Sequence, residues 1–130
     1  MKIAVIIVRT LMGLLFLFAS IVVLFNLVPK PPDLTGPVKA FNDGIEATGY
    51  FIKVLKITEL VCGLAFVTGR FVPLATIVIA PIIVNIFLFH AFLDHTGLPV
   101  AIFLVLANLF LAYAYRKSYE PLFVAKPALG

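Results

Sequence analysis

Glu59 is the residue whose position most suggests chemistry, because a carboxylic acid stands there among Ile, Leu, Val, Gly and Phe. Neither lipid nor a dry protein core stabilises a lone charge, so a partner must compensate it. Arg9 supplies the opposite charge from an earlier apolar segment, and Asn85 and Asn108 supply amides from two later ones. We therefore predict one buried polar layer of Arg9, Glu59, Asn85 and Asn108. It is either a structural ion pair with bridging amides or a set of ligand contacts.

A second polar group is expected toward the outer mouth of the protein and consists of Lys56, His90 and Asp94. We expect His90 to hydrogen-bond at the interface or to carry a proton together with Asp94. No second His or Cys stands at ligand spacing on the same predicted helix, so we predict no metal or haem site. Cys62 is the single cysteine, which excludes an internal disulfide and a CxxC redox motif.

The composition of the chain indicates an integral membrane protein. Of its 130 residues, 63% are hydrophobic, and the mean hydropathy is +1.18, whereas soluble domains average about 45–50% apolar residues. The formal net charge of +4 comes from basic residues scattered along the chain, so no nucleic-acid partner is expected. The sequence offers no nucleophile–base pair and no glycine-rich phosphate loop, so we do not expect catalysis by this chain alone.

Four apolar segments organise the chain, each close to the roughly 20 residues that a membrane span needs. We predict an all-α single domain over 1–130, a four-transmembrane-helix bundle with a long loop between helices 1 and 2. The predicted helices cover about 3–28, 49–68, 71–92 and 98–115, followed by a tail over 116–130. Prolines after the first helix end it, and residues 38–45 could form a short interfacial helix.

The basic residues predict how the protein lies in the membrane. With four spans, both termini and the turn at 68–70 share one side. That side holds Lys2, Arg70, Arg116, Lys117 and Lys126. Because cytoplasmic loops are enriched in Lys and Arg, we predict that both termini are cytoplasmic.

Several stretches of the sequence also resemble the DoxX family of four-helix membrane proteins. They are residues 9–20 (RTLMGLLFLFAS), the segment from Gly49 through Lys56 and Glu59 to Gly63, residues 70–75 (RFVPLA) and residues 80–90 (APIIVNIFLFH). Each motif is short and apolar, but their order and spacing match together. The resemblance covers nearly the whole chain apart from the connection at 29–48 and the tail.

The resemblance implies a function, because the family name derives from a subunit of a thiosulfate:quinone oxidoreductase. It implies a protein of the bacterial inner membrane that serves a membrane redox complex as a non-catalytic accessory or anchor subunit. Its partners would be lipid and other membrane subunits or a second copy. No cofactor would be bound covalently, but quinone or lipid could contact the region around Glu59.

Two other functions stay open at this point. A membrane assembly or chaperone-type structural protein would also lack catalytic groups and would dock onto another membrane protein. A small proton-linked transporter would use Arg9, Glu59 and His90, but four spans without an inverted repeat make it the least expected of the three.

Overall fold

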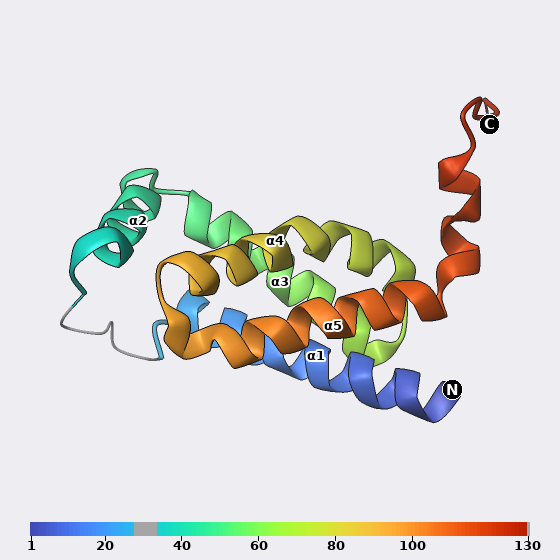
Figure 1. Cartoon of the computed structure of the whole chain (residues 1–130), viewed down its shortest axis with the longest axis horizontal. Coiled ribbons are helices and arrows are strands. Elements are labelled where there is room, and N and C mark those ends of the chain that lie inside the picture. Colours follow the sequence, from blue (N-terminus) through green and yellow to red (C-terminus); the bar gives the residue numbers. More distant parts are fainter. Residues whose placement is uncertain (28–33, 130) are drawn as a thin grey trace.

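The computed structural model describes residues 1–27 and 34–129, and within these ranges the chain is helical with no strand (Figure 1). The all-α prediction is therefore confirmed. The elements in chain order are α1 (Lys2–Leu24), α2 (Gly36–Ala47), α3 (Phe51–Thr68), α4 (Val72–Phe92), the short 3-10 helix η1 (His95–Gly97), α5 (Leu98–Ala114) and the 3-10 helix η2 (Arg116–Phe123).

The four long predicted helices correspond to α1, α3, α4 and α5, with ends that differ by a few residues. The largest difference is at α1, which ends at Leu24 and is followed by a turn at Phe25 and Asn26; the predicted end at residue 28 lies outside the described residues. The predicted long loop is corrected in part, because α2 occupies Gly36–Ala47, more than the suggested 38–45. The predicted tail contains η2.

Three helical segments are long and apolar enough to cross a membrane: Lys2–Leu24, Val72–Phe92 and His95–Ala114. Large apolar side chains stand exposed along all three, among them Leu14, Val84 and Leu106. Such surfaces suit lipid and not water. Helix α3 differs, because Lys53, Lys56 and Glu59 lie within its 18 residues, and composition alone does not mark it as a span.

The long helices lie side by side, with α3 in its most extensive contact with α1 and α5 in its most extensive contact with α4 (Figure 1). The crossing of α1 and α3 is close because Gly13 faces Gly63. A Cβ added to Gly13 would lie 2.9 Å from the Gly63 carbonyl oxygen and 2.7 Å from Val67 Cγ2. Small residues of this kind let membrane helices approach each other closely.

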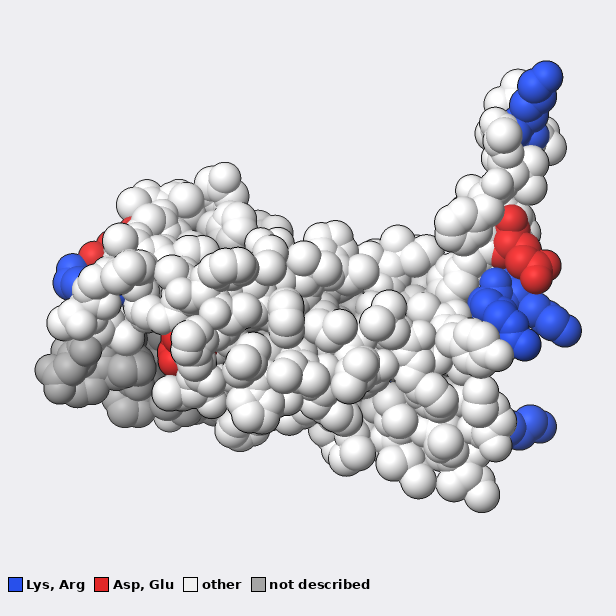
Figure 2. Space-filling view, viewed as in Figure 1, with Lys and Arg blue, Asp and Glu red and all other residues white. Residues whose placement is uncertain are grey.

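The two ends of the bundle carry different elements. The N-terminus, the α3–α4 turn and η2 lie at one end, which we call the tail end, and α2 and η1 lie at the other, the α2 end (Figure 1). Lys and Arg gather at the tail end, whereas basic and acidic groups mix at the α2 end (Figure 2). This excess of Lys and Arg at the tail end is the charge pattern from which we predict that both termini are cytoplasmic.

Candidate functional site

The buried acid of α3 is paired with a lysine of its own helix. Lys56 Nζ lies 3.0 Å from Glu59 Oε2, and the two side chains are 16% and 3% exposed. The contact is an ion pair without hydrogen-bond geometry, since no donor in the described chain is aligned with Oε2. The predicted pairing of Arg9 with Glu59 is wrong, because Arg9 binds backbone carbonyls of α3. Lys56, predicted at the outer mouth, lies in the first half of α3. The sequence feature that indicates the Lys56–Glu59 pair is the i, i+3 spacing of the two residues on one predicted helix.

Arg9 instead crosses from α1 to the C-terminal end of α3. Its Nη1 donates to the carbonyl oxygens of Phe66 at 2.8 Å and Val67 at 3.0 Å. Helix C-termini leave carbonyls without intrahelical donors and carry negative partial charge, so a guanidinium stabilises them. The guanidinium lies against Gly69, whose φ of +75° ends α3 in the left-handed region. A Cβ at Gly69 would lie 2.9 Å from Arg9 Cζ. Both the positive φ and this close approach therefore require a glycine at position 69.

Asn108 is buried, but it belongs to a second polar cluster that joins α4, α5 and the tail. Its Nδ2 donates to the Thr76 carbonyl oxygen at 3.3 Å, while its Oδ1 has no hydrogen-bond donor among the described residues. The Thr76 hydroxyl donates to the Pro73 carbonyl oxygen at 2.6 Å and also contacts the Tyr119 hydroxyl. Because the Thr76 proton is already engaged, Tyr119 is the donor. The sequence reasoning missed Thr76 and Tyr119, which no local pattern connects.

Asn85 lies outside any interior polar cluster. The residue is exposed, and its Nδ2 donates to the Pro81 carbonyl oxygen of its own helix at 2.9 Å. At about 100° per residue, Asn85 lies about 200° around α4 from the buried Ile83, so it faces the opposite side. The single predicted layer therefore does not form, and its four members lie in four different places.

His90 and Asp94 do meet, at the turn between α4 and α5. His90 Nδ1 lies 2.9 Å from the Asp94 carbonyl oxygen, and the ring occupies the space beside Gly97, where an added Cβ would lie 2.6 Å from Nδ1. The Asp94 carboxylate accepts from the Thr96 backbone N–H at 3.1 Å and hydroxyl at 2.7 Å. These hydrogen bonds, with a smaller contribution from the two nearby histidines, lower the pKa of Asp94. The contacts of His90 and Asp94 therefore stabilise the turn between α4 and α5.

A large hollow in the described part of the chain lies at the α2 end. Its volume is about 780 Å³, and it is bounded by the last turn of α1, by α2 and by the first turns of α3. The side chains that line it include the apolar Val23, Leu24, Ile45, Ile52 and Ile57 and the polar Asn26, Lys39, Asn42, Asp43, Glu46 and Lys53. We call it the α2 hollow. A lining that combines apolar and charged side chains fits an amphiphile, which has a hydrocarbon part and a polar head.

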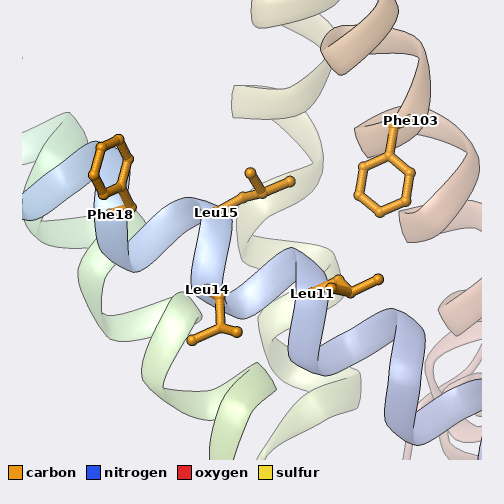
Figure 3. A pocket seen from close by; sticks show the side chains of 5 residues that line it. All are labelled: Leu11, Leu14, Leu15, Phe18 and Phe103. Atoms are coloured by element: carbon orange, nitrogen blue, oxygen red, sulfur yellow. The ribbon is translucent and has the colours of Figure 1, made fainter.

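A second, smaller hollow opens on the side of the bundle. Four side chains of α1, those of Leu11, Leu14, Leu15 and Phe18, line it together with Phe103 of α5 (Figure 3). Its volume is about 330 Å³. Because every lining side chain is apolar, this hollow suits a hydrocarbon chain and offers nothing to a polar head.

Metal ligation finds no support in the described residues, since no three His, Cys, Asp or Glu side chains gather in a group that could hold an ion. Cys62 is a buried free thiol. None of the predicted site residues lines the α2 hollow, although Ile52, Lys53 and Ile57, which do, are near Lys56 in the sequence of α3. The sequence feature that indicates the α2 hollow is the unusual length of the connection between the first two predicted membrane helices, which α2 occupies.

Comparison with known proteins gives one match. The DoxX family model matches residues 4–91, which extend from the first turn of α1 nearly to the end of α4. No curated protein and no solved structure matches the chain.

Proposed function

This chain is a multi-pass membrane protein that belongs to the DoxX family, and on that premise we propose that it is a non-catalytic accessory subunit of a membrane redox complex. It crosses the bilayer four times and holds an amphiphile, a quinone or a lipid, in the α2 hollow. The observation that carries the proposal is the α2 hollow itself, which apolar and charged side chains line together at one end of the bundle.

The fourth crossing is α3. Its 18 residues reach about 27 Å at 1.5 Å per residue, close to the ~30 Å of the hydrocarbon layer. The side chains that α3 exposes along one face are apolar: Val54, Ile57, Val61 and Leu64. They recur at helical spacing and form a stripe suited to lipid. Its buried charges pair with each other, which lowers the cost of carrying them through the membrane.

The polar groups inside the bundle have structural partners and do not converge on one point. Lys56 and Glu59 pair along α3, Arg9 binds the end of α3, and Asn108 joins α5 to α4. A catalytic centre requires a nucleophile, base or electrophile aimed at one reacting atom. The described arrangement favours a protein that positions something else, either a bound amphiphile or a partner subunit.

The α2 hollow can accept such an amphiphile because both apolar and charged side chains line it. Helix α3 alone contributes Ile52, Ile57 and Lys53. An isoprenoid or acyl chain would lie against the two isoleucines, and the head group would reach Lys53 at the membrane surface. Long lysine side chains favour this interfacial position because the stem stays in apolar surroundings while the ammonium reaches water.

The test is purification of the full chain in nanodiscs from its native membrane, with mass spectrometry of the proteins, quinones and lipids that accompany it. We expect oxidoreductase subunits and a retained amphiphile. An Ile52→Trp variant should fill the hollow and lose the amphiphile, whereas Val54→Trp on the exposed face of α3 should retain it.

Two results would contradict the proposal. Equal retention in both tryptophan variants would remove the amphiphile from the α2 hollow. Recovery of the chain alone, or with membrane proteins unrelated to redox chemistry, would reject the accessory role; the second of these results would favour the assembly-factor alternative.

A further inference from the structure

The C-terminal tail has a defined place at the end of the bundle. After α5 ends at Ala114, η2 turns away from the long direction of the bundle and runs across its tail end (Figure 1). The hydrogen bond between Tyr119 and Thr76 ties η2 to α4. Since the bundle helices are the membrane-crossing elements, a segment that runs across their ends lies along the membrane surface.

The tail end is strongly basic. Arg116, Lys117 and Lys126 come from the tail itself, and Lys2 and Arg70 come from the start of α1 and from the α3–α4 turn. Figure 2 shows basic side chains gathered at that end, with acidic atoms beside them. Glu120 is the one acid among residues 116–129. Such a concentration of positive charge attracts an anionic leaflet.

Arg116 is held in place at the start of this segment. Its guanidinium lies over the Tyr113 ring, with Cζ 4.5 Å from the ring centroid, and its Nη1 donates to the Tyr113 carbonyl oxygen at 3.0 Å. Both contacts keep the cation at the level where α5 ends. That level is where head-group phosphates lie around a spanning helix.

The same tail exposes large apolar side chains directly after the basic ones. Leu122, Phe123 and Val124 are 67%, 84% and 54% exposed, and no helix of the described bundle covers them. Water would not favour this arrangement, but an interfacial segment uses apolar side chains to enter the acyl boundary while its basic ones bind head groups.

We propose that residues 116–126 form an interfacial element that binds anionic phospholipids on the leaflet at the tail end. Arg116, Lys117 and Lys126 bind the head-group phosphates, and Leu122 and Phe123 insert below them. The occupant is the lipid surface itself, because basic charge, exposed apolar side chains and an orientation across the helix ends occur together here. This inference needs only the membrane location and is independent of the redox role.

The absence of tryptophan from the sequence makes a direct test available. In a Phe123→Trp variant of the full chain, the introduced side chain is the sole tryptophan, and its emission reports its surroundings. In nanodiscs that contain phosphatidylglycerol we expect a blue-shifted emission that brominated lipids quench. A Leu129→Trp variant, at a position that is fully exposed, serves as the control and should emit as in water.

The head-group contribution is measured by titrating the detergent-solubilised Phe123→Trp protein with short-chain phosphatidylglycerol and, separately, with phosphatidylcholine. We expect tighter binding of the anionic lipid, and a rise in Kd of about fivefold for Arg116→Gln and again for Lys117→Gln, the factor that each basic residue near an anionic surface supplies. Water-like emission of the Phe123→Trp variant in every lipid, or equal Kd values for the two lipids, would overturn the proposal and leave the tail as a surface for a protein partner.

Discussion

Helices α3 and α4 follow each other in sequence but satisfy their polar groups in different ways. Helix α4 contains no Lys, Arg, Asp or Glu, and its exposed amide, that of Asn85, hydrogen-bonds within its own helix. Helix α3 carries a buried ion pair, receives Arg9 from α1 at its end, and approaches α1 closely through Gly63. A bilayer could accept α4 alone, whereas α3, the proposed fourth crossing, would enter it only together with a neighbour.

The comparison explains why α1 and α3 make the most extensive contact in the bundle. In lipid the hydrophobic effect does not drive helices together, so close packing and polar contacts must hold them. Substitutions on α3 and at its crossing with α1 should therefore destabilise the protein more than comparable substitutions on α4.

The largest effect is expected from Lys56→Ala, which leaves the Glu59 carboxylate buried without its counter-ion. Removal of one partner of a buried ion pair costs about 3–5 kcal/mol of unfolding free energy. Reversible SDS unfolding in mixed micelles measures this loss. Lys53→Ala, at an exposed lysine one turn away, and Asn85→Ala on α4 should each change stability by less than about 1 kcal/mol.

A double variant sharpens the same prediction. Lys56→Met combined with Glu59→Leu removes both charges and should recover most of the stability, because buried ion pairs are often no more stabilising than apolar side chains of similar volume. If Lys56→Ala and Asn85→Ala were equally mild, the contrast between the two helices would fail.

A smaller effect is expected from Gly13→Ala at the α1–α3 crossing. The added Cβ would meet the backbone of Gly63 and Val67 at 2.9 Å, and such overpacking costs about 1–3 kcal/mol. Gly63→Ala meets its nearest atoms at 3.1 Å and should cost less. Gly44→Ala in α2 has open space and should be neutral or slightly stabilising. The same unfolding assay ranks the three glycine variants by their loss of unfolding free energy. A different order would show that α1 and α3 do not make the close contact described.

The smallest effect is expected from a change of pH, which should destabilise the turn after α4 but not the C-terminal end of α3. Because the pKa of Asp94 is lowered in the folded protein, its contribution is present above the ordinary aspartate pKa of about 4 and is lost as the pH falls through the lowered value. Hydrogen exchange at residues 94–97 should therefore accelerate in acid, whereas the end of α3, which Arg9 caps, should not respond. In Asp94→Asn the exchange should become independent of pH after correction for the intrinsic rate.

The sequence predicted the long helices because apolar runs between proline or glycine breaks are strong local signals. It predicted less about the interior, since an apolar helix such as α4 has no polar face from which its rotation can be read. The sequence therefore predicts Asn85 inside, although the residue is exposed. It predicts a pair of Arg9 with Glu59, but backbone carbonyls at the end of α3 bind Arg9 instead. That contact depends on where α1 and the end of α3 lie in the folded protein, and no spacing in the sequence indicates it.

The most direct test of the account is the sidedness of the two ends of α3. In a Cys62→Ser background, which removes the single native cysteine, Tyr50→Cys and Arg70→Cys are labelled with a membrane-impermeant maleimide in intact cells and in inverted vesicles, with Lys126→Cys as the reference for the tail end. The account predicts that residue 70 is labelled from the same side as residue 126, and residue 50 from the opposite side. Labelling of residues 50 and 70 from one side would contradict the fourth crossing and the role assigned to the Lys56–Glu59 pair within it.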